Sequence, residues 1–473
     1  MSKVSSGFIW SAIDHFSVQG IQFLLSIIIT RLVSPDAFGT VVMVQVFMSF
    51  AQVFIEGGFK SALIQKKDRN DEDFHTVFIF NMTIAVVLYM VMYVSAPFIA
   101  DFYNQPILKD ITRVISLNLI FSSLSITQLV KLQSTLNFKV LAKSRVISVL
   151  ISGALGVFLA YKGFEAWALV FQSVLCTCIT SVLLLYFSRW KPRFIFSKES
   201  FKFLFGFGSK ILFSNFLTTL YMQMTNLVIG KFYTTSQLAY YNRGFTLSNM
   251  PSTSIVEVMG RTIYPIFCDH QTDKGLLKQL YRKYLRLTCY IVFPLMFLVS
   301  ILSKPLIHFL FTDVWMNTAP FLSIFCIAFA TYPIQYITGH LVLALGYSGL
   351  MAKANVVKQI VAFSLMIISL FISIKAVAYS LMICNFINVF IGVYCVRKVS
   401  MISIKEQLGY IIPVLLISLA ACLISYLTCF LFSSSFLKVS CGGLIGVIVY
   451  LIMTKFFNFE EKVLLERIFK IKR

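Results

Sequence analysis

The sequence predicts an all-α integral membrane protein of about fourteen transmembrane helices, built as two parallel six-helix repeats with a C-terminal helix pair and a central cavity. Three observations predict this class. Of the 473 residues, 58% are hydrophobic and only 13% are charged, a balance typical of chains with many membrane spans. Apolar runs long enough to cross a bilayer recur along the whole chain. Lysine and arginine are concentrated in every second connection between these runs.

Six apolar runs predict the helices of the first repeat. Because a membrane span needs about 20 apolar residues, we expect helices over residues 8–31, 38–58, 76–99, 112–133, 144–161 and 166–188. The first run contains Asp14 and His15 and has no small-residue cleavage site. We therefore interpret it as a membrane helix rather than a removable signal peptide.

Eight further runs predict the rest of the molecule. The second repeat is expected to have helices over residues 203–230, 237–260, 285–303, 317–341, 354–374 and 376–396. The C-terminal pair is expected over residues 409–432 and 436–456. The predicted domains are therefore residues 1–200, residues 201–400, and residues 401–473, the last with a basic cytoplasmic tail.

The basic residues predict the orientation of the chain. With the N-terminus inside, the cytoplasmic connections hold clusters such as Lys66, Lys67 and Arg69, whereas the outer connections hold fewer lysines and arginines. Both termini are then cytoplasmic. The net charge of +22 follows this alternation and forms no aromatic-interleaved basic patch. We therefore expect contact with anionic membrane lipids and no nucleic-acid partner.

The sequence predicts no metal site and no cofactor. The ten cysteines fall mostly inside the predicted spans without the spacing of metal ligands, so we interpret them as small apolar residues and expect no disulfide framework. A phosphate-binding Gly-Lys loop is also absent from the sequence, so ATP hydrolysis is not supported.

Two segments of the sequence correspond at a spacing of 200 residues. Aligning "ITRLVSPDAFG" at 29–39 with "IGKFYTTSQLA" at 229–239 places Arg31 on Lys231. Each repeat has an even number of spans, so both begin on the same side, and such parallel repeats are a transporter architecture with the substrate site between the halves. Arg31 and Lys231 mark equivalent outer helix ends. They either anchor the helices at the membrane interface or contact a substrate headgroup as it leaves.

Polar side chains form a stripe on each of four predicted helices, the first and second of each repeat. Their spacing of three or four residues places each set on one helical face. The stripes are Ser11, His15, Gln19, Gln22, Ser26 and Thr30; Gln45, Ser49, Gln52 and Glu56; Lys210, Ser214, Thr218, Tyr221 and Thr225; and Thr246, Asn249, Thr253 and Glu257, with Arg243 one turn earlier. Amides and charges facing lipid are costly, so we expect these faces to point at protein or water. Interhelical hydrogen bonding is the alternative explanation.

These stripes supply the candidate site residues. The candidates for substrate binding are Lys210, Arg243, Gln22, Gln52, Tyr221 and Asn249, joined by Lys358 of the eleventh span. The candidates for gating or ion coupling are Asp14, Glu56 and Glu257. A lining rich in cations, amides and hydroxyls suits an anionic substrate with many hydroxyl groups. A lipid-linked oligosaccharide diphosphate has both properties.

Several motifs resemble those of a known family. They are "QFLLSIIITRLVSPDAFG", "GGFKSALIQKKD", "EAWALV", "VIGKFYTTSQLAYYNRG", "GRTIYPIF" and the tryptophan of "FTDVWMNTAP". With them the chain resembles the polysaccharide-transport branch of the multidrug/oligosaccharidyl-lipid/polysaccharide exporter superfamily. This branch contains the flippases of O-antigen and capsule repeat units, and the likeness is greatest to those of the colanic acid exporter type. The chain departs from the family pattern at Glu165, Ala166 and Ala239.

The resemblance implies a function for the chain. It implies alternating access that moves undecaprenyl-diphosphate-linked oligosaccharide across the bacterial inner membrane, through a cavity lined by the same four helices that carry the stripes. A polysaccharide polymerase and a chain-length regulator are the protein partners that it suggests. Two alternatives stay open: a drug or cation antiporter of the same superfamily, and a membrane-embedded polymerase or ligase. The second would need catalytic residues in a large outer loop, and the outer connections here are short, so we do not expect an enzyme.

Overall fold

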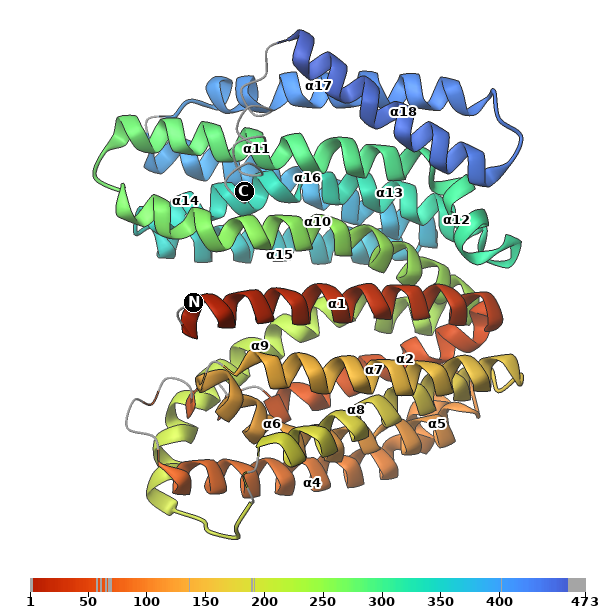
Figure 1. The fold of residues 1–473 in the computed structure, drawn as a ribbon, viewed down its shortest axis with the longest axis vertical. Helices are drawn as coiled ribbons and strands as arrows, with labels where there is room; N and C mark the ends of the chain where they lie inside the picture. The colour runs from red at the N-terminus through yellow and green to blue at the C-terminus, as the bar shows by residue number, and fades with distance from the viewer. Residues whose placement is uncertain are drawn as a thin grey trace. The chain divides into compact units, whose positions relative to one another are not determined.

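The computed structural model describes residues 3–457, except 57, 60, 61, 64, 65, 67–69, 136, 189, 191 and 401; the side chains of residues 3–16, 56, 207, 210 and 261 are also outside this description. The described chain contains helices and no strand (Figure 1). Its contacts divide it into two units, Met1–Ala239 and Tyr240–Arg473.

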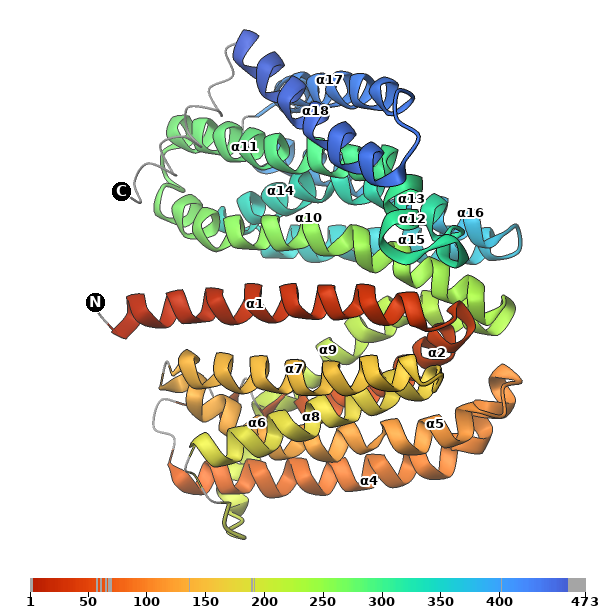
Figure 2. The same cartoon turned by 45° about the vertical axis from the view of Figure 1, so that its right-hand side comes forward.

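The first unit is a bundle of long helices. Its elements are α1 (Lys3–Leu32), α2 (Pro35–Glu56), α4 (Asp71–Tyr103), α5 (Leu108–Ile115), α6 (Leu117–Ser134), α7 (Phe138–Tyr161), α8 (Ala166–Ser188) and α9 (Lys198–Phe232). Helix α7 packs on both α1 and α8, α6 packs on α4 and α8, and α9 packs on α2. Figure 2 shows α7 and α4 running along a similar direction, with α6 and α8 of the same bundle between them.

The second unit starts within α10 (Thr235–Asp269), the first five residues of which belong to the first unit. The other elements are α11 (Lys274–Ile301), α12 (Ser303–Phe311), the short 3₁₀ helix η1 (Asp313–Trp315), α13 (Thr318–Ala330), α14 (Tyr332–Ala344), α15 (Ser348–Leu370), α16 (Ile374–Val399), α17 (Ile404–Cys429) and α18 (Ser435–Phe456). Helix α11 packs on α13 and α17, α15 packs on α16, and α17 packs on α18.

The predicted all-α membrane class is confirmed, but the predicted number of spans is not. Among the described residues, eleven helices are long and apolar enough to cross a membrane, or twelve if the bent helix α9 is one span. Helix α9 bends by 48° between Gly206 and Ile211. Helix α10 falls outside this set because its sequence contains many polar residues. The domain boundary predicted at residue 200 concerns sequence repeats rather than contacts, and it stays a prediction.

Local sequence signals explain where several helices begin. Asn70 and Asp73 form a capping box at the start of α4, in which each side chain accepts a hydrogen bond from the backbone N–H of the other. Ser403 and Glu406 do the same at the start of α17. These side chains satisfy N–H groups that have no partner inside the helix.

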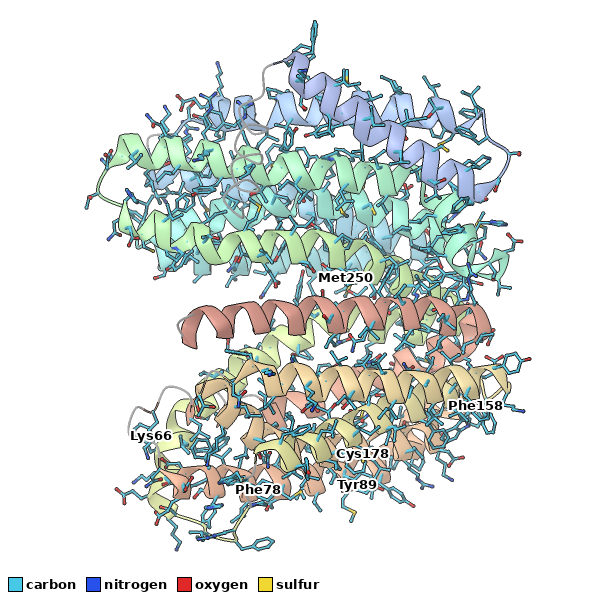
Figure 3. The ribbon with its side chains drawn as sticks, viewed as in Figure 1. Lys66, Phe78, Tyr89, Phe158, Cys178 and Met250 are labelled. Atoms are coloured by element: carbon cyan, nitrogen blue, oxygen red, sulfur yellow. The ribbon has the colours of Figure 1, made fainter. Side chains whose placement is uncertain are left out.

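One hydrophobic cluster joins the start of α4 to the segment that links the two repeats. It consists of Phe59, Ala62, Leu63, Phe74, Val77, Phe78, Val130, Trp190 and Leu204. Lys66 forms an ion pair of 2.7 Å with the buried carboxylate of Asp73 beside it. Lys66 and Phe78 are labelled in Figure 3. Trp190, in the segment between α8 and α9, is therefore packed against the start of α4.

Candidate functional site

The polar stripe of α10 lies on a face that its own unit leaves partly open. Thr246 and Glu257 are exposed, and Asn249 and Thr253 are half-buried. On the neighbouring face of the same helix Ser248, Ser252 and Val256 are completely buried, and the Ser252 hydroxyl donates to the Phe329 carbonyl of α13 at 2.8 Å. Met250 marks the middle of α10 in Figure 3. The helix thus packs through one face and presents the predicted stripe on the next.

The stripe of α2 takes part in hydrogen bonds within the first unit. The Gln223 amide of α9 donates to the Ser49 hydroxyl at 3.1 Å. The Ser122 hydroxyl of α6 donates to the Gln52 side-chain oxygen at 3.3 Å. Gln45, by contrast, is exposed. For Ser49 and Gln52 the alternative explanation, hydrogen bonding between helices, therefore applies at least in part.

The described part of the stripe is mostly exposed on α9, whereas on α1 it ranges from exposed Gln22 to buried Thr30. Gln22 is exposed on α1, and Tyr221 on α9 keeps 37% of its surface. Of the remaining predicted site residues, Lys210 falls within the bend of α9, and Asp14 and Glu56 fall on α1 and α2. The side chains of these three residues lie outside the described part of the structure.

Arg243 is packed inside the second unit rather than displayed on the open stripe. Only 6% of the residue is exposed, and its guanidinium lies 4.9 Å from the centre of the Phe311 ring of α12. The adjacent Gly244 abuts α13 so closely that a Cβ atom there would lie 2.8 Å from the Cβ of Phe321. This neighbourhood offers a cation–π contact to the buried charge. A role for Arg243 in substrate binding stays a prediction.

Glu257 and Lys358 occupy different parts of the second unit. Glu257 is exposed and lies within electrostatic range of Tyr332 on α14. Lys358 is half-buried on α15, within electrostatic range of Cys395 on α16. Their proposed functions, in coupling and in binding, stay predictions.

The two outer-end cations have different surroundings. Lys231 donates a hydrogen bond to the Phe102 carbonyl in the last turn of α4, and its ammonium lies 4.6 Å from the centre of the Phe102 ring. Carbonyls in the last turn lack partners inside the helix and carry the negative end of its dipole. Arg31 is exposed at the end of α1. Lys231 therefore serves at least to cap a neighbouring helix.

The two aligned turns contact each other, which the sequence analysis did not foresee. The Ser236 hydroxyl donates to the Asp36 carboxylate at 2.6 Å. A Cβ atom on Gly39 would lie 2.1 Å from the Thr235 carbonyl oxygen. Only glycine allows this approach of two backbones. The repeat alignment matched these turns but contained no signal that they touch.

Glu165 forms hydrogen bonds that the sequence did not predict. Its carboxylate accepts hydrogen bonds from the backbone N–H of Ser34 at 2.9 Å and from the Ser34 hydroxyl at 2.8 Å. It thereby ties the connection between α7 and α8 to the turn between α1 and α2. Glu165 has a positive φ of 46°, a conformation that is uncommon for residues other than glycine.

The described residues of the stripes present polar side chains on partly open helix faces. These side chains are amides, hydroxyls and carboxylates. Such groups can bind the hydroxyl groups of a polar ligand. Among all the residues that the structure describes, no group of three or more His, Cys, Asp or Glu side chains is placed to hold a metal ion.

Comparisons with known proteins relate the chain to polysaccharide biosynthesis. A family model described as "Polysaccharide biosynthesis protein" matches residues 28–320. The teichuronic acid biosynthesis protein TuaB of Bacillus subtilis (strain 168) is 24% identical over 350 residues, which cover 74% of this chain and 72% of TuaB. The succinoglycan biosynthesis transport protein ExoT of Rhizobium meliloti (strain 1021) is 25% identical over 324 residues, 67% of this chain and 65% of ExoT.

A solved structure shares the fold. The structure of the lipid II flippase MurJ in an inward closed conformation aligns with a TM-score of 0.74 and 18% identity, covering 95% of this chain and 98% of MurJ. At this identity the likeness concerns the arrangement of the helices.

Proposed function

Because the chain belongs to the family of polysaccharide biosynthesis proteins, we propose that it is a flippase that moves lipid-linked oligosaccharide across the bacterial inner membrane. The observation that supports this most directly is the polar stripe of α10, where Asn249, Thr253 and Glu257 lie on a partly open face of a long helix. Such side chains are costly against lipid and match the hydroxyl groups of a sugar. ExoT, a relative, is named a transport protein.

The proposal extends to the carrier and the route. The carrier lipid is undecaprenyl diphosphate, and the glycan is a repeat unit of O-antigen, capsule or exopolysaccharide. Both termini lie in the cytoplasm, and the substrate passes between the two six-helix repeats by alternating access. The protein catalyses no covalent step. A polysaccharide polymerase with its chain-length regulator receives the substrate in the outer leaflet.

The candidate residues divide by chemistry within this proposal. Lys210, Arg243 and Lys358 bind the diphosphate, because cations form charge-assisted hydrogen bonds with phosphate oxygens. Gln22, Gln52, Tyr221 and Asn249 bind sugar hydroxyls. Asp14, Glu56 and Glu257 are the groups through which an ion gradient is coupled to the conformational change.

A reconstitution experiment tests the proposed function. Purified protein is placed in proteoliposomes that contain undecaprenyl diphosphate bearing the repeat unit of the host bacterium. Exposure of the glycan on the opposite leaflet is then followed with an impermeant lectin. We expect glycan exposure to be faster than in protein-free liposomes. Export of ethidium without any movement of the glycan lipid would contradict the proposal and favour the antiporter alternative.

A further inference from the structure

Four aromatic rings form a continuous row in the second unit. Tyr332, Tyr336 and His340 are spaced four residues apart, so they share one face of α14. Their ring centres are 5.9 Å apart for Tyr332 and Tyr336, and 4.2 Å apart for Tyr336 and His340. Tyr264 of α10 extends the row, with its ring centre 5.2 Å from that of His340. From Tyr332 to His340 the row covers about 12 Å along the helix.

A glycine brings α10 against this row. A Cβ atom on Gly260 would lie 2.1 Å from Cε1 and 2.4 Å from the hydroxyl oxygen of Tyr336. The Tyr336 ring therefore rests directly on the backbone of α10. The close approach fixes the position of the ring between the two helices.

The aromatic row borders the polar stripe of α10. Asn249, Thr253, Glu257, Gly260 and Tyr264 follow one another at spacings of four, four, three and four residues, so they lie on one helical face. Glu257 is exposed and within electrostatic range of Tyr332. Tyr264 keeps 38% of its surface, and the three rings on α14 are half-buried. The Glu257 carboxylate therefore lies near one end of the aromatic row, and the Thr253 hydroxyl and the Asn249 amide continue the same face of α10 away from the rings.

This combination matches the chemistry of a sugar. A pyranose has apolar C–H faces, which pack against aromatic rings, and a rim of hydroxyl groups, which need acceptors and donors. The rings extend in a line that is about the length of a short oligosaccharide. A cage for an organic cation would instead surround one point.

We propose that Tyr264, Tyr332, Tyr336 and His340, together with Glu257, form the subsite that binds the glycan of the transported lipid. This inference rests on the proposed function and assigns it a glycan-binding surface. The rings contact the sugar faces, and the Glu257 carboxylate accepts hydrogen bonds from sugar hydroxyls. The subsite distinguishes a carrier lipid that bears a glycan from the bare carrier.

A binding experiment tests the subsite. The probes are undecaprenyl diphosphate carrying the host's repeat unit and undecaprenyl diphosphate alone, each titrated against the purified full-length protein in nanodiscs. We expect Tyr264→Ala to weaken binding of the glycan-bearing lipid about two- to tenfold, the range for loss of one aromatic contact, and to leave binding of the bare lipid unchanged. Tyr264→Phe retains the ring and should retain the affinity.

A matched control separates the subsite from general effects. Tyr379 on α16 has a similar exposure of 48% and lies outside the row, so Tyr379→Ala should bind both lipids as the unaltered protein does. Tyr332→Ala provides a second variant should Tyr264→Ala fold poorly. Equal weakening for both lipids, or no weakening in either variant, would overturn the subsite. Weaker binding of tetraphenylphosphonium with unchanged glycan binding would overturn it in favour of a cation site.

The proteoliposome and nanodisc experiments together distinguish the two proposals. If the unaltered protein moves the glycan lipid and both alanine variants keep its preference for that lipid, the subsite is wrong and the proposed function stands. If the unaltered protein neither moves the glycan lipid nor distinguishes it from the bare lipid, both proposals are wrong.

Discussion

Lys231 illustrates how a single side chain joins the ends of two helices, α9 and α4. Its ammonium donates to the Phe102 carbonyl and lies over the Phe102 ring. We predict that Lys231→Ala lowers the free energy of unfolding by about 0.5 kcal/mol, because a cation at a helix C-terminus contributes roughly that much. Thermal unfolding of the purified protein in detergent measures this change. Lys109→Ala, which removes an exposed lysine of α5, is the control, and an equal loss there would refute the capping role.

Substitution of Arg243 distinguishes a structural role of this residue from a role in substrate binding. Its burial and its position over Phe311 lead us to expect that Arg243→Ala lowers the amount of protein in the membrane, since a desolvated cation–π contact contributes about 2 kcal/mol. Arg243→Lys keeps the charge and should lower it less. Membrane abundance is measured by immunoblot beside surface glycan display. Normal abundance with lost display would instead support the predicted role in substrate binding.

At the residue scale, the sequence predicted which side chains share a helical face, but not which side chains on other helices they contact. The periodicity of Thr246, Asn249, Thr253 and Glu257 placed them together on α10, because helical spacing is a local property. The partners of Ser49 and Gln52 depend on the register between helices that are far apart in the sequence, and periodicity contains no such information. The aromatic row was missed for a related reason. Its spacing on α14 is visible in the sequence, but the ring from α10 joins it only through tertiary packing.

At the scale of elements, Gly39 near the start of α2 provides a further prediction. A Cβ atom on Gly39 would lie 2.1 Å from a backbone oxygen, which cannot rotate away as a side chain can. We predict that Gly39→Ala destabilises the protein by about 1–3 kcal/mol, the usual cost of overpacking. Lower thermal stability and lower membrane abundance are the expected measurements.

Gly20 provides the control for that substitution. Among the described residues, nothing lies within 4 Å of a Cβ atom built on Gly20 of α1. Gly20→Ala should therefore be neutral or stabilising, because alanine is favoured over glycine inside a helix. Equal stability of both variants would show that the two turns separate easily.

Hydropathy predicted that the long helices exist, but it did not predict where they bend or break. Apolar runs predicted long helices because the bilayer sets the length of a span. The bend in α9 between Gly206 and Ile211 and the break between α5 and α6 had no distinct signal in those runs. A span was predicted over residues 237–260 from an apolar run, although the polar residues of α10 keep the helix outside the set of apolar helices.

For the whole molecule, the orientation in the membrane is still to be measured. The charge alternation predicts that Lys198 and Lys274, both exposed at helix starts, face the cytoplasm, and that the exposed Lys109 and Asp313 face outward. In a variant without native cysteines, single cysteines at these positions are treated with an impermeant maleimide in intact cells. Labelling is expected at 109 and 313 alone, and labelling at 198 would contradict the topology.

The membrane class of the molecule could be predicted from composition, whereas the extent of its two contact units could not. Hydropathy and charge are sums over the chain, so the abundance of apolar residues sufficed for the membrane class. The boundary between the contact units falls after residue 239 because α9 packs on α2 and α4 of the first unit. Contacts of this kind depend on three-dimensional packing, which a repeat in the sequence does not specify. The repeat boundary at residue 200 is a different division and stays a prediction.

The meeting of the two aligned turns has a consequence for the origin of the chain. Asp36 and Ser236 are counterparts at a spacing of 200 residues and are hydrogen-bonded to each other. In a symmetric homodimer, a position that touches its own copy lies on the two-fold axis. The contact is therefore what gene duplication and fusion of a half-length dimeric ancestor would leave. Divergence of the two copies after such a fusion would account for an aspartate facing a serine, and for a glycine at 39 where its counterpart at 239 is alanine.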